Sequence, residues 1–465
     1  MNATVDGAFT EKLAYYCSTA CLDDIPKPIR ERAKYVILDG IGCGLFGARL
    51  PWSEILTRTI APLSAGGPST VWGTDLRLPP DHAALLNGSF VQGFELDDGH
   101  SVGGLHECAN VVPAALSCTD LGGPLSGADL LTAIIVGFEV GPRVGMCVGA
   151  AKILERGWHG GSVVGIFGAA AAGGRVLRLT PQQMVHALGI AGTQASGLMA
   201  AQYGSMVKRM HHGRSTQSGF YAAALARNGY TGIERVFEER YGGFCSTFLG
   251  TPDGFDLNKL TDGLGARYEV ERINLKSYAC NGSIHPSLEA IQAIRKRRPF
   301  VSDEVRMVTV RCTRATFGHV GWKYEPSSSS MTSAQMNLSF GIAAMIEYGS
   351  AFVDQYTEKA IRSPRLVDLT QKVSAVHEPA FDLLGPQHRH HTELTVEFLD
   401  GSRETETVIE RSPVSNDKIA AKYDRLARET LSSDQAGELK NQILHMEELD
   451  DARSLSQLLR GSKSP

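Results

Sequence analysis

The chain lacks the cysteine spacings that frame a zinc ribbon or a disulfide scaffold. Its 465 residues include nine cysteines, and no two of them form a CxxC pair. Paired cysteines at short spacings are typical of structural zinc sites and of small disulfide-bonded domains. The nine cysteines therefore indicate reduced thiols in a reducing compartment.

The chain also has no excess of one charge and no long uncharged apolar run. Its 46 basic and 50 acidic residues give a net charge of -4, which offers no electrostatic support for nucleic-acid binding. The first residues mix acids and bases without an apolar core of signal-peptide length, and no later run reaches membrane-spanning length without charge. We expect a cytoplasmic protein without a nucleic-acid or membrane partner.

Common cofactor motifs are missing as well. There is no GxxxxGK[ST] phosphate loop and no GxSxG nucleophile elbow. The glycine-rich segment 157–174 does not follow a strand pattern, as a dinucleotide fingerprint would. Together these absences leave phosphate, dinucleotide and serine-hydrolase functions without support.

The chain is too long for one ordinary hydrophobic core, and its hydrophobic periodicity changes along the sequence, which divides it into parts. From about residue 8 to 250, apolar residues recur at three-and-four spacing, and Ser126 and Thr180 begin two of these helical segments as N-caps. After about residue 415 the helical pattern returns. We therefore predict a mainly α fold with an α+β insert: a helical domain of residues 1–270 and 413–465, and a lid domain of residues 271–412.

The predicted lid carries the strand patterns. Residues 267–276, 304–317 and 391–411 alternate apolar and polar positions and are rich in β-branched side chains. Asp400 and Gly401 predict a hairpin turn inside the last of these segments. Segments 284–297 and 333–349 predict helices between the strands. A cleft between two such domains is a usual place for a small-molecule site.

One short stretch, FELDDGHSVGGLHECAN at 94–110, gathers carboxylates and imidazoles. Its acidic and histidine residues are Glu95, Asp97, Asp98, His100, His106 and Glu107. The order fits a calcium loop poorly, and the spacing of the two histidines matches no common zinc motif. We expect no metal, which leaves an acid/base site or an exposed charged turn.

Further histidines and lysines lie in apolar, glycine-rich surroundings: His159, Lys208, His212, Lys276 and His285. A buried ammonium group costs several kcal/mol unless an anion lies nearby. An anionic substrate with more than one carboxylate is an economical partner for these lysines.

Each of these residues also has a purely structural interpretation. Lys208 stands beside Arg209 and could lie on a solvated face, and His159 could be a satisfied core histidine. His106 could cap the helix that follows it, and the two aspartates could cap a turn. Residue spacing alone leaves these alternatives open.

The motifs together resemble the MmgE/PrpD family along nearly the whole chain. The segments that carry the resemblance are RAKYVILDGIGCGLFGARLPWSE, GFELDDGHSVGGLHECANVVPAA, GWHGGSVVGIFGAAAAGGRVLRLTP, ALGIAGTQASGLMAAQYGSMVKRMHHG and LKSYACNGSIHP. Among family members, the fungal cis-aconitate decarboxylases are most similar. The resemblance implies a helical domain built from both chain ends, an inserted lid, a homodimer, and a site between the domains without a cofactor.

The resemblance also implies roles for individual residues. It predicts catalytic roles for His106, His159, Lys208 and Lys276. It predicts substrate-binding roles for Asp97, His100, Ser101, His212, Tyr278 and His285. The implied activity is decarboxylation of cis-aconitate, or of a close di- or tricarboxylate, to itaconate.

Three other activities stay open from sequence: dehydration of 2-methylcitrate, epimerisation of an amino- or imino-dicarboxylate such as iminodisuccinate, and non-catalytic binding of a polycarboxylate. Two departures from the resembled enzymes bear on the substrate. Val102, Gly103 and Gly104 replace an acidic residue and a proline of the fungal enzymes, and we expect this exchange to loosen the turn. Asn281 stands where the mammalian enzymes have histidine.

Overall fold

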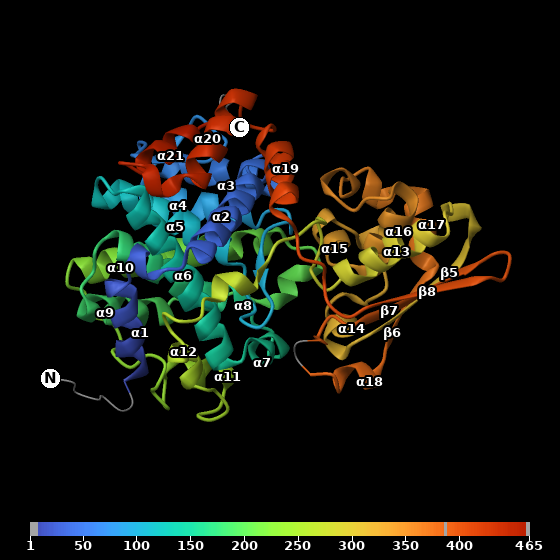
Figure 1. The fold of residues 1–465 in the computed structure, drawn as a ribbon, viewed down its shortest axis with the longest axis horizontal. Helices are drawn as coiled ribbons and strands as arrows, with labels where there is room; N and C mark the ends of the chain where they lie inside the picture. Colours follow the sequence, from blue (N-terminus) through green and yellow to red (C-terminus); the bar gives the residue numbers. More distant parts are fainter. Residues whose placement is uncertain (1–7, 386–387, 462–465) are drawn as a thin grey trace.

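The computed structural model describes residues 8–385 and 388–461. Two parts lie side by side in Figure 1: a helical body, built from α1–α12 and α19–α21, and a lid, built from α13–α18 and β5–β8. This arrangement confirms the predicted fold class, mainly α with an α+β insert. The predicted boundaries near residues 270 and 412 stay predictions.

The helical body packs around two long apolar helices. Its helices are α1 (Phe9–Thr19), α2 (Lys27–Gly47), α3 (Pro51–Ile60), α4 (Pro80–Val91), α5 (Glu107–Gly122), α6 (Gly127–Val148), α7 (Ala150–Glu155), α8 (Gly160–Val176), α9 (Pro181–Gly192), α10 (His211–Arg227), α11 (Phe244–Leu249) and α12 (Asn258–Thr261). Helix α6 packs against α8 in the core. A Cβ added to Gly137 of α6 would lie 2.9 Å from the carbonyl oxygen of Gly168 in α8, so glycine allows the two backbones to approach closely.

Helix α6 is long and apolar enough to cross a membrane, but 94% of its most apolar window is buried inside the protein. It is therefore the central core helix of the body. The two predicted N-caps are confirmed: Ser126 accepts a hydrogen bond from the amide of Asp129 at the start of α6, and Thr180 forms a capping box with Gln183 at the start of α9.

The lid is a four-stranded sheet covered by helices. Its strands are β5 (Val305–Cys312), β6 (Val373–His377), β7 (Thr392–Phe398) and β8 (Arg403–Val408), in the order β6-β5-β7-β8. Its helices are α13 (His285–Arg297), α14 (Arg314–Val320), α15 (Met331–Gln335), α16 (Leu338–Tyr348), α17 (Pro364–Gln371) and α18 (Pro379–Asp382). Helices α13 and α16 pack against the sheet. Alternate residues of β7 are therefore buried, since alternate side chains of a strand point to the same face.

The strand predictions had mixed outcomes. Segment 391–411 forms the β7–β8 hairpin, with Gly401 at φ 86° in the predicted turn. Segment 304–317 forms β5 only as far as Cys312, and the prediction was wrong for its end, where Arg314 begins the helix α14. Segment 267–276 was wrongly predicted as a strand, since Glu269–Arg272 is a 3-10 turn and only β4 (Ile273–Asn274) is extended. This short strand pairs with β3 (Gly99–His100). The pairing connects the segment that leads into the lid with the 94–110 loop. The parallel edge strand β6 was not predicted.

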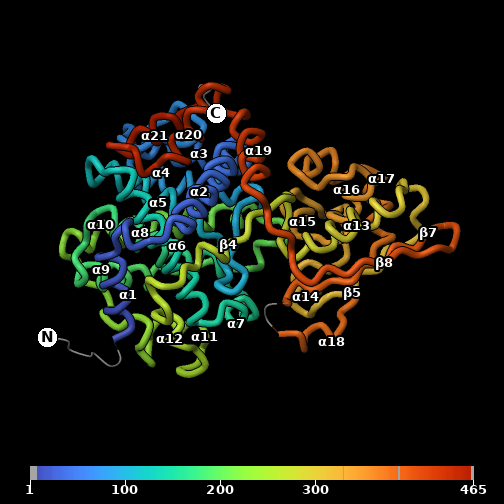
Figure 2. The backbone as a smooth tube through the Cα atoms, viewed as in Figure 1, coloured from blue at the N-terminus to red at the C-terminus, as the bar shows by residue number. Residues whose placement is uncertain are grey.

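After β8 the chain returns to the body. Helices α19 (Asn416–Ala427) and α20 (Ser433–Leu444) lie beside α2, as the red and blue tubes in Figure 2 show, and α21 (Arg453–Leu458) packs against α20 and α5. Lys422 of α19 donates to the carbonyl oxygens of Leu96 and Lys276 and pairs with the buried Asp39 at 2.8 Å. The C-terminal segment thus holds two loops of the candidate site in place. The other short strands, β1 (Ser69–Thr70) and β2 (Arg77–Leu78), form a small ribbon at the edge of the body.

Candidate active site

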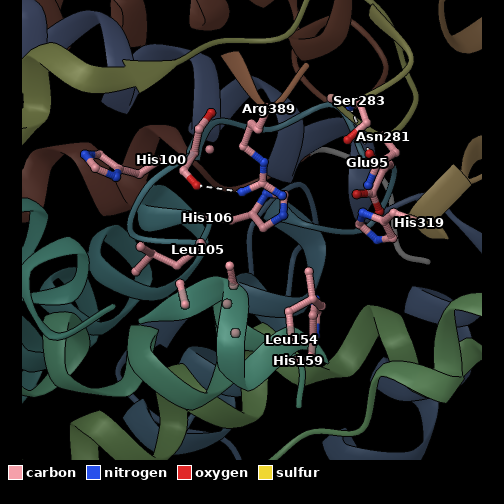
Figure 3. Close-up of a pocket in the computed structure, with 18 of the residues that line it drawn as sticks. Glu95, His100, Leu105, His106, Leu154, His159, Asn281, Ser283, His319 and Arg389 are labelled. Carbon is pink, nitrogen blue, oxygen red and sulfur yellow. Dashed lines mark hydrogen bonds between the residues drawn. The ribbon is translucent and has the colours of Figure 1, made fainter. Parts of the chain in front are cut away.

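A cavity of ≈ 140 Å³ lies between the body and the lid (Figure 3). The body and its connection to the lid contribute Glu95, His100, Ser101, His106, His159, Lys208 and Lys276 to the lining, and the lid side contributes Asn281, Ser283, His319, Met336, Arg389, His390 and Arg411. Imidazole, ammonium and guanidinium groups dominate this lining. The cavity is suited to a small anion with several carboxylates.

The loop between α4 and α5 brings the carboxylates to the cavity. Asp98 accepts hydrogen bonds from the amides of Glu107 and Cys108 and so caps α5, which makes its capping interpretation correct. His106 precedes the same helix, but its side chain makes no capping hydrogen bond. Burial raises the pKa of Asp98, and burial together with Asp98 raises the pKa of Glu107 well above its usual value. Glu107 is therefore a neutral acid next to a capping aspartate.

His106 has a buried carboxylate behind it. Asp97 is fully buried, and its Oδ2 lies 3.1 Å from Nδ1 of His106. Among the described residues, neither oxygen of Asp97 accepts a hydrogen bond, so its contact with His106 is a close approach of charge, and Lys276 lies 4.0 Å away. The imidazole of His106 keeps 18% of its surface exposed and lines the cavity. The negative charge of Asp97 near Nδ1 favours a proton on the imidazole of His106, which could then give a proton to a ligand in the cavity.

Glu95 joins the cationic groups on the body side. It lies 2.6 Å from Nζ of Lys208 and 2.8 Å from the guanidinium of Arg209, and its carbonyl oxygen accepts a hydrogen bond from Lys276. Glu95 adopts φ 57°, a strained conformation for a residue with a side chain, which turns its carboxylate toward these partners. Burial alone would raise the pKa of Glu95, but the three cations hold it well below its usual value.

The structure excludes the purely structural alternative for Lys208. Lys208 is 2% exposed, so it does not lie on a solvated face. It has an anionic partner within the chain, because it donates a hydrogen bond to Glu95, and a substrate carboxylate as a further partner stays a prediction. Burial lowers the pKa of Lys208 to about 8 despite the attraction of Glu95. Lys208 is therefore a charged group at neutral pH that loses its proton in mildly alkaline solution.

His212 packs edge to face against His106 and His159 behind the cavity wall. His212 is fully buried, and its ring centroid lies 5.0 Å from that of His106 and 5.1 Å from that of His159. Nδ1 of His159 lies 2.9 Å from Nδ1 of His211, so one of these two nitrogens carries a proton and donates it. Burial and then the charge of Lys208 lower the pKa of His159 well below its usual value. His159 is a neutral imidazole in the free protein.

The predicted binding residues on the 94–110 loop are placed differently from one another. Ser101 lines the cavity; its carbonyl oxygen and hydroxyl accept hydrogen bonds from Arg389 and Arg411. His100 also lines the cavity, but its Nε2 pairs with Glu269 at 3.0 Å and its Nδ1 accepts from the amide of Gly103. A substrate contact through a ring nitrogen of His100 would have to break one of these bonds.

The Val102, Gly103 and Gly104 turn is held by backbone hydrogen bonds, and the expectation that it is looser than in the fungal enzymes stays a prediction. The amide of Gly104 donates to the carbonyl oxygen of His100 at 2.7 Å, and His100 donates to Leu105. Gly104 has φ 69°, and a Cβ there would lie 2.5 Å from Cβ of Ala150. Glycine is therefore required for the loop to pack against the start of α7.

Two other predicted binding residues do not line the cavity. The hydroxyl of Tyr278 donates to Gln292, and its ring packs against the buried imidazole of His285 at 5.0 Å. Nε2 of His285 lies 3.3 Å from the carbonyl oxygen of Cys280. His212 is likewise behind the wall. Substrate-binding roles for Tyr278, His285 and His212 stay predictions, and as placed these residues act on the cavity through their neighbours.

Several lining residues were not predicted from the sequence. Glu95 was noted in the acidic stretch but received no role, and four lid residues received none: His319, Arg389, His390 and Arg411. Arg389 and His390 are adjacent in one turn, Arg411 follows β8, and His319 lies in α14. These three places are far apart in sequence, and no local spacing links them. Within the described ranges 8–385 and 388–461, no group of three or more histidine, cysteine or acidic side chains is placed to hold a metal ion.

Comparison with known proteins assigns the chain. Residues 11–255 match the model of the MmgE/PrpD N-terminal domain, and residues 278–448 match that of the MmgE/PrpD C-terminal domain. The chain belongs to the MmgE/PrpD family. The C-terminal match runs past the lid into α19 and α20, so the family's C-terminal domain contains both the lid and part of the helical body.

Relatives within the MmgE/PrpD family span the whole chain. The protein is 36% identical to the cis-aconitate decarboxylase-like protein oryM of Aspergillus oryzae, over 99% of both chains. It is also 36% identical to the cis-aconitate decarboxylase of Aspergillus terreus, over 98% of this chain and 97% of the relative. The 2-methylcitrate dehydratase of Salmonella typhimurium is 22% identical, over 82% of this chain and 80% of the relative.

Proposed function

We propose that the protein decarboxylates cis-aconitate to itaconate. The observation that carries this proposal is the cavity itself, where the Asp97 and His106 pair faces a set of cationic side chains in a chain that is similar over its full length to cis-aconitate decarboxylases. An acid beside several cations suits a reaction that builds negative charge on a polycarboxylate and then takes up one proton.

The reaction breaks one carbon–carbon bond and makes one carbon–hydrogen bond. The bond between the CH₂ group and its carboxylate breaks, CO₂ leaves as a neutral molecule, and the electron pair forms a new terminal double bond. The former double-bond electrons move to the far carbon, which takes one proton to give itaconate. Lys208 and Lys276 lie at the cavity wall and stabilise the negative charge during this step, a contribution of about 3 kcal/mol for one well-placed donor.

We assign the proton donor to His106. Its imidazole lines the cavity and has Asp97 behind it, whereas the pKa of His159 lies well below its usual value because of burial and the charge of Lys208. His159, as a neutral imidazole, can donate a hydrogen bond to a substrate carboxylate or accept a proton in the reverse direction. The two histidines therefore have different tasks.

The second candidate function is dehydration of 2-methylcitrate. That reaction needs a base to remove a carbon-bound proton and an acid to assist the departure of hydroxide, and the neutral His159 and His106 could supply both. The dehydratase of Salmonella typhimurium is the weaker relative, at 22% identity. Decarboxylation is therefore the leading proposal.

A direct assay separates these functions. Purified protein is incubated with cis-aconitate and, separately, with 2-methylcitrate, and products are followed by proton NMR and CO₂ release. We expect itaconate and CO₂ in equal amounts from cis-aconitate. Absence of itaconate at high enzyme concentration, together with rapid dehydration of 2-methylcitrate, would reverse the order of the two candidates. The same assay with EDTA tests a metal-independent reaction, for which we expect no change in rate.

We also propose that the protein is a cytoplasmic homodimer. The exposed side chains of Ile55, Met206 and Val207 line an apolar groove of ≈ 270 Å³ on the body, directly beside Lys208 and Arg209, and a second copy of the chain would cover it. All nine cysteines are free, which suits a reducing compartment. Sedimentation of wild type and of Val207→Asp tests the dimer: we expect dimer mass for the first and monomer mass for the second.

A further inference from the structure

Two arginines on the lid side of the cavity have no acidic partner. The side chains of Arg389 and Arg411 line the cavity, and neither forms an ion pair with a carboxylate in the part of the chain that the structure describes. Their recorded partners are the carbonyl oxygen of Ser101 at 2.9 Å for Arg389 and its hydroxyl at 3.1 Å for Arg411. Figure 3 shows Arg389 with its hydrogen bond drawn as a dashed line.

Other polar atoms around these arginines also lack partners. Nε of Arg389, Nε2 of His319 and Nδ1 of His390 are buried and have no hydrogen-bond partner among the described residues. All three side chains line the same cavity. Nε of Arg389 is a donor, and a buried donor without an acceptor costs about 1–3 kcal/mol, so such a group is retained where an acceptor arrives with a ligand. The two imidazole nitrogens donate or accept according to the tautomer.

The electrostatics at this end of the cavity favour an anion. Burial and then the neighbouring charge of Arg389 lower the pKa of Arg411 to about 10. Burial and then the charge of Arg389 lower the pKa of His319 to about 4, so this imidazole is neutral at neutral pH and carries no charge. The nearest acidic influence on Arg411 is Glu289, which already accepts hydrogen bonds from Ser412.

The body side of the cavity is balanced differently. There Glu95 and Asp97 lie within 4 Å of the cations Lys208, Arg209 and Lys276 and compensate most of their charge. The lid side has two positive charges without such compensation. The strongest unbalanced attraction for an anion therefore lies at the lid end of the cavity.

We propose that Arg389 and Arg411 form a carboxylate subsite that binds a carboxylate of the substrate which the product keeps. This inference rests on the proposed decarboxylation. Guanidinium groups bind carboxylates through paired, charge-assisted hydrogen bonds, and the two arginines from separate lid loops give this subsite a fixed place on the lid.

The chemistry decides which carboxylate occupies the subsite. The leaving carboxylate loses its charge as it becomes CO₂, so two arginines bound to it would stabilise the substrate more than the transition state and slow the reaction. A retained carboxylate keeps its charge throughout, and binding it costs no rate. The leaving group therefore lies away from Arg389 and Arg411.

Itaconate provides the test, because it carries both retained carboxylates and lacks the leaving one. Variants Arg411→Gln and Arg389→Gln are compared with wild type for the KM of cis-aconitate and for the Kd of itaconate measured by calorimetry. We expect both constants to rise by the same factor, roughly 10- to 100-fold, which is the effect of losing one charge-assisted hydrogen-bonded contact. Arg306→Gln, on the outer face of β5, is the matched lid control and should change neither constant.

Three outcomes overturn the subsite. A raised KM with an unchanged itaconate Kd would place the leaving carboxylate on the arginines. Unchanged values of both constants would show that the arginines do not bind substrate. Failure of the wild type to bind itaconate would exclude a dicarboxylate of this kind as the ligand of the subsite. Arg411→Lys keeps a positive charge and serves where the glutamine variant melts early: it should bind itaconate more tightly than Arg411→Gln. If the wild type binds itaconate through these arginines but does not convert cis-aconitate, the proposed function is contradicted and the carboxylate subsite is still supported.

Discussion

At the scale of single residues, the site depends on two buried carboxylates with different partners. Glu95 compensates the charges of Lys208 and Arg209, while Asp97 lies 3.1 Å from His106 and accepts no hydrogen bond among the described residues. The first organises binding and the second supports proton transfer. Sequence could not show that Glu95 pairs with Lys208 and Arg209, because these residues are more than 100 positions apart.

Replacing Asp97 by asparagine tests its support of His106. The side chain keeps its size, so we expect the melting temperature to change little, while kcat falls about 100-fold or more because the imidazole loses its carboxylate partner. Steady-state kinetics and a thermal melt measure the two effects. A variant with the wild-type kcat would show that Asp97 has no part in the reaction.

The pKa of Lys208 predicts the alkaline limit of activity. Because this pKa is lowered to about 8 by burial, the ammonium group loses its proton as pH rises through this value, and its attraction for substrate is lost. We expect kcat/KM, which reports the free enzyme, to fall above about pH 8. In Lys208→Arg the charge persists to much higher pH, so the fall should disappear from the pH profile even if overall activity is lower. An unchanged alkaline fall in that variant would assign it to another group.

At the scale of elements, helix starts position the imidazoles. His159 precedes α8 and His211 begins α10, and Gly161 in the first turn of α8 leaves room for the ring of His212. The glycine-rich sequence of this helix allows such close packing. What sequence could not show is that the neighbour is a histidine rather than another backbone, since the side chain comes from a different helix.

Gly161→Ala tests this packing. A Cβ at Gly161 would lie 2.4 Å from Nε2 of the fully buried His212, which must then move against His106 and His159. We expect a loss of about 1–3 kcal/mol in the free energy of unfolding, together with reduced kcat. The matched control is Gly437→Ala in α20, where nothing lies within 4 Å of the new Cβ. That change should stabilise the protein by about 0.5–1 kcal/mol, measured by urea unfolding. Equal effects of the two substitutions would contradict the packing argument.

At the scale of the whole molecule, the site exists because three separated parts of the chain meet. The body supplies His106 and Lys208, the lid supplies Arg389, and α19 from the C-terminal segment anchors the site loops through Lys422. Hydrophobic periodicity and composition predicted the helical body, the mixed lid and the helical C-terminal segment, because both can be read from neighbouring residues in the sequence. The lid arginines escaped prediction because loop residues carry no period, and only the fold brings them to the cavity.

The central claim is that the cavity removes CO₂ from the CH₂ end of cis-aconitate and protonates the far carbon. Turnover in D₂O, followed by proton and carbon NMR, measures this most directly. We predict itaconate with one deuterium in its saturated CH₂ group, none in the terminal vinyl group, and one CO₂ for each molecule formed. Deuterium in the vinyl group, or conversion of cis-aconitate without itaconate, would contradict the mechanism.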